Sequence, residues 1–239
     1  MVLAMHMSDG LVTPPTALAF GIVAAIGLAV AATRARRDLD DRTAPMAGLV
    51  TAFVFAVQMV NFPVLPGASG HLLGGALVAI LVGPWVGSLC LAIVLVVQAL
   101  LFADGGLTAL GTNIVNMAFV GVFVGYGVAV VLRRFAVRSR AGLLGTAFVA
   151  ALLNTVVAAM SFVLQYAIGG AGGASLGTVF VLMLAFHVLI GIGEGVITAA
   201  TVGAVAAVRP DLVHLLRGAR SAPPVRSAAG RNAAGRGAA

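Results

Sequence analysis

Long stretches without a charged side chain decide what this chain can fold into. A helix needs about 20 consecutive apolar residues to cross the hydrocarbon core of a bilayer, and several stretches of the sequence approach or exceed that length. Charged residues make up only 9% of the chain, whereas a soluble domain carries roughly 25%. The sequence therefore predicts an all-α, polytopic membrane helix bundle.

Seven apolar segments are bounded by proline, glycine or charged residues, and we expect each to form a transmembrane helix. The third segment has about 13 residues, too few to cross a bilayer alone, so we expect it to be tilted, broken or buried among its neighbours. The predicted helices cover residues 14–32, 45–61, 71–83, 85–102, 113–132, 142–168 and 178–208.

The distribution of positive charge predicts the orientation of these helices. All fourteen basic residues are Arg. The first of them, Arg34, follows the first apolar segment, whereas a signal peptide carries its positive charge before that segment. Seven crossings from an outer N-terminus place every Arg on the inner side, in residues 33–44, 133–141 and 209–239. The positive-inside rule thus favours seven transmembrane helices with the N-terminus outside.

Composition also limits the partners and the compartment. A net charge of +7 would suggest nucleic acid for a soluble protein, but here the basic residues lie in short loops and the tail, so we expect no nucleic-acid partner. The single cysteine, Cys90, cannot form an internal disulfide or a cysteine metal cluster. Residues 213–239 lack apolar periodicity, and we expect a disordered cytoplasmic tail in contact with the lipid bilayer, after a transmembrane metal-binding domain of residues 1–212.

Two histidines stand out against the apolar background. His6 lies in a polar stretch near the N-terminus, and His71 lies where a glycine-rich loop meets the third apolar segment. The predicted topology places both on the outer face. Carboxylates are too few for a hard-cation cage, whereas imidazole nitrogens suit Ni, Co, Cu or Zn. We expect the polar stretch with His6 and the loop with His71 to meet around a metal ion, and we expect Asp9, Asn61 and Ser69 to lie close to the ligands.

Eight blocks of sequence carry a family resemblance. They are MHMSDG at 5–10, NFPV at 61–64, SGHLLGGA at 69–76, GPW at 83–85, QALLF at 98–102, DGG at 104–106, NIVNM at 113–117 and HVLIGIGE at 187–194. In this order they resemble the substrate-binding membrane component (S component) of energy-coupling-factor (ECF) transporters for cobalt and nickel. The resemblance runs from Met5 to about Leu212.

The resemblance implies a specific set of metal ligands. They are the terminal amine of Met5, the amide nitrogen and imidazole of His6, and the imidazole of His71, in a near square-planar site. Four nitrogens in a plane favour Ni(II), Cu(II) or Co(II) over tetrahedral Zn. Because residues 1–4 precede Met5, its amine is free only in a chain that starts there, which we expect. The transported substrate is Co²⁺ or Ni²⁺, and the sequence leaves that choice open.

The resemblance also implies partners. The sequence holds no Walker motif, so we expect ATP hydrolysis to fall to separate ATPase subunits, and we expect the chain itself to be a transport component and not an enzyme. The resemblance implies a coupling transmembrane subunit and a small accessory membrane protein as well. It also implies a multi-pass protein of the cell (inner or plasma) membrane, in an importer that supplies metal for cobalamin biosynthesis.

Two intramembrane residues and two alternative functions complete the predictions. Glu194 and His187 lie seven residues apart on one face of the last predicted helix. We expect Glu194 to serve helix packing or contact with the partner subunit more than metal binding.

A stand-alone secondary carrier or channel for divalent metals would line its path with several ionisable residues, and these two stand almost alone. An intramembrane metalloprotease would need a His-Glu-x-x-His motif, which is absent.

Overall fold

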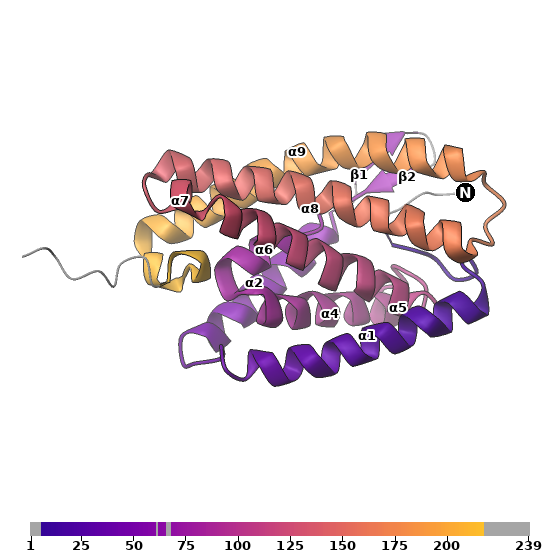
Figure 1. The fold of residues 1–239 in the computed structure, drawn as a ribbon, viewed down its shortest axis with the longest axis horizontal. Coiled ribbons are helices and arrows are strands. Elements are labelled where there is room, and N and C mark those ends of the chain that lie inside the picture. Colours follow the sequence, from indigo (N-terminus) through magenta and orange to yellow (C-terminus); the bar gives the residue numbers. More distant parts are fainter. Residues whose placement is uncertain (1–5, 61, 66–67, 218–239) are drawn as a thin grey trace, which may run out of the picture.

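The chain folds into a helical bundle with one short β-hairpin (Figure 1). The structure, a computed structural model, describes residues 6–60, 62–65 and 68–217, with residues 62–65 and 68–70 described by their backbone. The prediction of an all-α membrane bundle is confirmed in its class. The helices are α1 (Pro14–Ala35), α2 (Thr43–Gln58), α3 (Gly75–Val82), α4 (Pro84–Leu101), α5 (Leu110–Asn113), the π-helix η1 (Ile114–Gly121), α6 (Val122–Val131), α7 (Arg133–Ala136), α8 (Arg140–Gly169) and α9 (Leu176–Val208).

Five helical stretches in the described part of the chain are long and apolar enough to cross a membrane. They are α1, α4, the continuous rod α5–η1–α6, α8 and α9. Helix α2, with 16 residues, and α3, with eight, are shorter. Five of the seven predicted transmembrane helices therefore have the length of a membrane span, and the two shorter ones, α2 and α3, do not.

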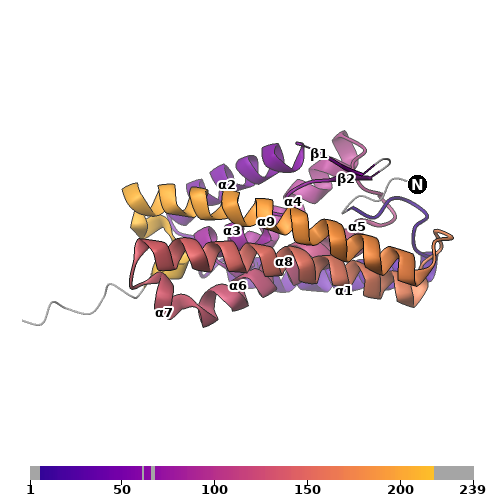
Figure 2. The same cartoon turned by 90° about the horizontal axis from the view of Figure 1, so that it is seen from above.

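Helix α3 begins later than the sequence predicts. The predicted helix starts at His71, but residues 71–74 are not helical, because Gly74 adopts a φ of +82° and bonds at its amide to another helix. All residues of α3 are buried. A Cβ on Gly75 would lie 2.9 Å from the carbonyl carbon of Gly121, and one on Gly125 would lie 2.8 Å from Cα of Ala76. These glycines allow α3 and the η1–α6 rod to pack backbone to backbone, so this short helix lies among the longer ones (Figure 2).

A β-hairpin precedes His71, where the sequence predicts only a loop. Strands β1 (Phe62–Leu65) and β2 (Ala68–Gly70) pair in antiparallel register, with Phe62 opposite Gly70. The hairpin lies at the same end of the bundle as the N-terminal segment, α5 and the turn between α8 and α9 (Figure 1). This end carries the candidate site.

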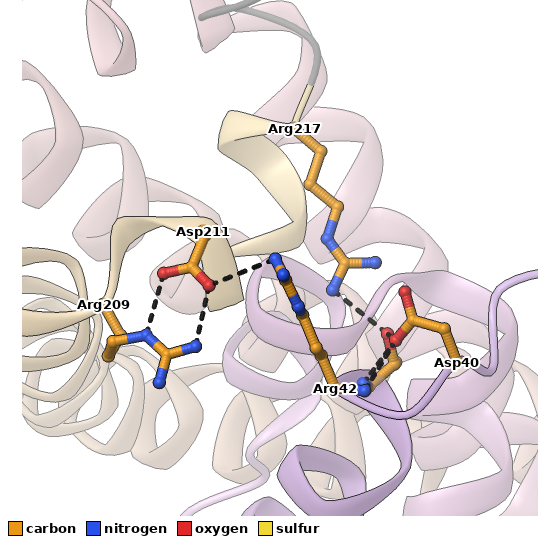
Figure 3. A network of polar contacts seen from close by, with 6 residues as sticks. Asp40, Arg42, Arg209, Asp211 and Arg217 are labelled. Atoms are coloured by element: carbon orange, nitrogen blue, oxygen red, sulfur yellow. Dashed lines mark hydrogen bonds and ion pairs between the residues drawn. The ribbon is translucent and has the colours of Figure 1, made fainter.

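Several arginines and the C-terminal segment lie at the opposite end of the bundle. Two 3₁₀ turns, η2 (Pro210–Leu212) and η3 (His214–Leu216), continue the fold past the predicted domain boundary at residue 212, and Val213 and Leu215 are buried. Arg209 and Arg42 pair with Asp211 at 2.8 Å and 3.7 Å (Figure 3). The rest of the predicted tail, residues 218–239, lies outside the described residues.

Candidate metal centre

The N-terminal segment is fixed against the loop between α4 and α5. The amide of Met7 donates to Asn113 Oδ1 at 2.8 Å, and the carbonyl of Met7 accepts from Asn113 Nδ2 at 3.1 Å and from the amide of Gly106 at 2.8 Å. A Cβ on Gly106 would lie 2.3 Å from the amide nitrogen of Asp9, so this approach requires glycine. Three hydrogen bonds thus hold the residue next to His6 in place.

This arrangement brings His6 and His71 together, as the sequence predicts. The centroids of the two imidazole rings lie 4.5 Å apart, with 46° between their planes. His6 is 5% exposed and His71 is 1% exposed. Two histidines separated by more than sixty residues therefore form one buried pair at the end of the bundle.

Each ring of the pair uses one nitrogen and leaves the other unused. His6 Nδ1 donates to Asp104 Oδ1 at 3.0 Å, and His71 Nδ1 donates to the carbonyl oxygen of Leu72 at 2.9 Å. Because a carbonyl only accepts, the proton of neutral His71 is on Nδ1 and the lone pair is on Nε2. Both Nε2 atoms are buried without a hydrogen-bond partner among the described residues. An imidazole held through one nitrogen, with the other free, is the usual state of a metal ligand.

The two carboxylates near the pair have different roles. Asp104 accepts the hydrogen bond from His6, which is the main reason that its pKa lies below the usual range. Asp9 instead accepts from the hydroxyl and the amide of Thr108, at 2.6 and 2.8 Å, and these bonds lower its pKa. Asp9, predicted to hold an imidazole, therefore anchors the loop, and Asp104 is the residue that bonds to the ring.

The segment that carries His71 is fastened by a buried carboxylate from α9. Glu194 accepts from the amide of Leu73 at 2.7 Å and from the amide of Gly74 at 3.0 Å. It also accepts from Asn154 Nδ2 at 2.9 Å and from Thr155 Oγ1 at 2.8 Å, both on α8. These four bonds satisfy both carboxylate oxygens and two amides that no helix or strand uses.

Gln58 completes this attachment from the opposite side. Its Nε2 donates to the carbonyl of Leu73 at 2.6 Å, and Gln58 is fully buried at the end of α2. Leu73 is therefore held at its amide by α9 and at its carbonyl by α2. The position of His71, two residues earlier, is set by this framework. The sequence offers no signal for it, since the groups that Glu194 and Gln58 bind on this segment are backbone amides and a backbone carbonyl.

The structure describes only some of the remaining predicted site residues. Met5 and Asn61 lie outside the described residues, and Ser69 is described by its backbone, which pairs with Pro63 in the hairpin. Within residues 6–60, 62–65 and 68–217, no group of three His, Cys, Asp or Glu side chains is placed to hold one metal ion. The described part of the chain thus offers two imidazoles, those of His6 and His71, as candidate metal ligands.

The sequence of this chain matches a family of known proteins. Residues 6–212 match the family model described as "Cobalt uptake substrate-specific transmembrane region". A protein of Sorangium cellulosum named "Cobalt transport protein CbiM" is 34% identical over 227 residues, which cover 92% of this chain and 99% of that protein. A protein of Rhodobacter capsulatus named "Fused nickel transport protein NikMN" is 38% identical over 121 residues, which cover 50% of this chain and 35% of that protein.

Solved structures agree with the sequence relatives. A crystal structure of a truncated transition metal transporter superposes with a TM-score of 0.74 at 30% identity, covering 84% of this chain and 98% of that one. A second structure of a transition metal transporter has the same TM-score and identity and covers 85% of this chain and 93% of the other.

Proposed function

Because the chain belongs to the family of cobalt-uptake substrate-specific transmembrane proteins, a membrane component of cobalt or nickel transport, we propose that it is the substrate-binding subunit of an ATP-driven ECF importer. The observation that carries the proposal is the buried pair His6–His71, whose Nε2 atoms point to no partner in the described structure. Neutral nitrogen donors suit Co²⁺ and Ni²⁺. These ions are the cargo of the protein and not a resident cofactor.

The proposed ligand set is the amine of Met5, the amide and imidazole of His6, and the imidazole of His71. An imidazole closes a chelate ring with its own backbone amide only through Nδ1, because Nε2 lies on the far side of the ring. In the described structure Nδ1 of His6 bonds to Asp104. The chelate therefore requires this ring to turn over, so that Nε2 takes the bond to Asp104 and Nδ1 faces the metal.

A chain that keeps residues 1–4 has a different site. The nitrogen of Met5 is then part of a peptide bond, and the His6 ring can stay as it is, offering Nε2 beside Nε2 of His71. Two imidazoles and water form a weaker and more open site than four nitrogens in a plane. Which of the two sites is used depends on the first residue of the mature chain.

The proposed topology has seven passes, with the N-terminus outside and residues 218–239 inside. Support comes from the separation of charge in the bundle: Arg42, Arg133, Arg209 and Arg217 gather at the end opposite the histidine pair. Metal capture then takes place on the outer face of the cell membrane. Separate ATPase subunits, a coupling transmembrane subunit and a small accessory membrane protein complete the importer.

Metal titration tests the proposed site. A purified chain that starts at Met5 should bind Ni²⁺ and Co²⁺ tightly, and a chain that starts at Met1 should bind them more weakly. Equal affinities would exclude the amine as a ligand. Uptake into vesicles with and without the ATPase subunits tests the mechanism, because a stand-alone carrier or channel would transport metal without them.

A further inference from the structure

A third buried imidazole lies on α9 and has no role in the site described above. His187 is 4% exposed, and its Nδ1 donates to the carbonyl of Met183, one turn earlier, at 2.6 Å. Its Nε2 is buried with no hydrogen-bond partner in the described part of the chain. Since the carbonyl only accepts, neutral His187 carries its lone pair on this unused Nε2.

His187 therefore repeats the state of His6 and His71. In each of the three residues Nδ1 donates to an oxygen and Nε2 is left buried and unpaired among the described residues. A buried polar atom without a partner has a free-energy cost. A bound metal ion would offset this cost, because the lone pair of an imidazole nitrogen coordinates divalent transition metals.

The bonds to Glu194 and the packing of β2 on α9 place the segment that carries His71 against the helix of His187. Helix α9 rises about 1.5 Å per residue, so His187 lies roughly 10 Å before Glu194 along the helix. The non-helical segment that ends at Gly74 can advance at most about 3.3 Å per residue, so His71 lies up to about 10 Å before Gly74. Gly74 is bonded to Glu194, and α9 also packs against β2, which precedes His71. His71 lies between these two contacts, in the part of the chain that runs along α9, the helix that carries His187.

The N-terminal segment reaches the same part of α9. Met7, which follows His6, belongs to one buried apolar cluster with Met183, whose carbonyl holds the His187 ring. The histidine pair is therefore connected to α9, the helix of His187, in two ways. Met7 shares a buried apolar cluster with Met183, and the segment that carries His71 bonds to Glu194. No three of these side chains are placed to hold a single ion in the described structure, so His187 is not a third ligand of the same coordination shell.

We propose that Nε2 of His187 is a second ligand position for the transported divalent metal ion, adjacent to His71, which binds the ion when it leaves His6. This inference rests on the proposed metal-uptake function. His71 is then common to both positions: it holds the ion with the N-terminal segment at first and with α9 afterwards. The ion moves between neighbouring imidazoles without an intermediate free state in the apolar interior, where an unpaired charge is costly.

A thiolate at position 187 gives a direct test, with Co²⁺ as the probe. The purified full chain carries Cys90→Ala, so that no native thiol contributes, and His6→Ala, so that the first position is disabled. Adding His187→Cys should produce a sulfur-to-cobalt charge-transfer band at saturating Co²⁺, because thiolate is a good ligand for this ion. The matched control is Ile190→Cys, equally buried and one turn further along α9, which should give no band.

The possible results separate this inference from the proposed function. The absence of a band from the His187→Cys variant, in a protein whose His6-containing form still binds Co²⁺, would overturn the inference and leave the outer site intact. Failure of the unmutated chain to bind Co²⁺ or Ni²⁺ would instead refute the proposed function.

A second variant covers the case in which the thiol disturbs the fold. In His187→Asn the side-chain amide can still donate to Met183, but the Nε2 lone pair is gone. In the His6→Ala background this change should weaken Co²⁺ binding by about tenfold or more. With His6 present, the same change should keep the wild-type affinity. An equal loss in both backgrounds indicates a structural role, and no loss in either removes His187 from the path; both results contradict the proposal.

Discussion

The two ends of the bundle use their polar residues in opposite ways. Towards one end His6 and His71 are buried, with Glu194 buried near the middle of α9, and each is fixed by hydrogen bonds to buried or half-buried groups. At the other end Arg42, Arg209 and Asp211 form ion pairs whose side chains are 40–69% exposed (Figure 3). The histidine end thus depends on a few buried polar contacts, whereas the charged side chains of the arginine end remain in contact with water.

The difference in burial decides how much each contact contributes. Leaving a buried donor or acceptor without its partner costs about 1–3 kcal/mol, and more when the group is charged. An exposed ion pair contributes only about 0.2–1 kcal/mol and is weakened by salt. Substitutions at the histidine end should therefore have large, specific effects, and those at the arginine end should have small ones.

The largest effect is expected for His71→Ala. The change removes a direct ligand of the proposed site, whereas loss of a group that only supports a ligand already costs about 10–100-fold in metal affinity. We expect a weakening of Ni²⁺ or Co²⁺ binding of at least about 100-fold, measured by titration of the purified protein. His214→Ala, which removes a half-buried imidazole from the arginine end, is the control and should keep the affinity. An unchanged affinity in His71→Ala would remove the histidine pair from the proposed function.

The next effect concerns Asp104, which orients the ring of His6. Asp104→Ala removes the acceptor of the 3.0 Å hydrogen bond, so the imidazole loses its fixed orientation and part of its basicity. Metal affinity should fall by about 10–100-fold. Asp9→Ala is the matched change, since it removes a nearby carboxylate that bonds to Thr108 and not to a ring. A greater loss from Asp9→Ala than from Asp104→Ala would reverse the roles of the two carboxylates.

Glu194→Gln should act on stability first and on metal binding second. The amide group of Gln would face donors where the carboxylate accepts from Leu73, Gly74, Asn154 and Thr155. We expect the free energy of unfolding to fall by about 1–3 kcal/mol and metal affinity to fall with it, because the segment carrying His71 is released. Thermal unfolding in detergent and a metal titration measure the two effects. If neither changes, these bonds do not position His71.

The ion pairs at the other end should contribute little. Asp211→Ala removes the acceptor for Arg209 and Arg42, and we expect only a small loss in the free energy of unfolding, because the pair is exposed to water. The loss should shrink further as the salt concentration rises past about 0.1 M, because dissolved ions screen exposed charges. A destabilisation equal to that of Glu194→Gln would show that the two ends do not differ in how much their polar contacts contribute.

The smallest effect is a pH dependence at Asp40. Its carboxylate accepts from the amide and the hydroxyl of Thr43 at the start of α2, at 2.6 and 2.7 Å, and these bonds lower its pKa to about 2. A lowered pKa means that the stabilisation is complete above the unfolded pKa of about 3.9 and is lost as the pH falls towards about 2. The difference in melting temperature between the wild type and Asp40→Ala should therefore shrink between about pH 4 and about pH 2. A constant difference would contradict this role of the carboxylate.

The sequence predicts the helices and the pairing of the two histidines better than it predicts what holds them. Apolar segments of bilayer length are visible directly in the residues, so α8 and α9 begin and end within two residues of their predicted limits. The meeting of His6 and His71 follows from the topology and from the family motifs. In contrast, the hairpin before His71 and the late start of α3 depend on the φ of Gly74 and on strand pairing, which have no periodic signal.

The partners of Glu194 show why the remainder could not be predicted. A carboxylate in an apolar segment indicates a special role, but the groups it binds are the amides of Leu73 and Gly74, and every residue except proline has such an amide. The same holds for Gln58 and the carbonyl of Leu73. The predicted topology puts Asp104 on the same face as His6, but the sequence does not show that Asp104, and not Asp9, bonds to the ring.

The bonds that fix Met7 have a kinetic consequence. Both Nε2 atoms of the histidine pair are buried, and the N-terminal segment that carries His6, a source of ligands in the proposed site, is held by Asn113 and Gly106. In the proposed site an ion would therefore enter or leave when this segment opens. The rate of loading then has an upper limit set by local opening of the chain, so that loading becomes independent of metal supply once ions are abundant. The same opening step would govern release, so the rate at which the bound ion dissociates would have the same upper limit.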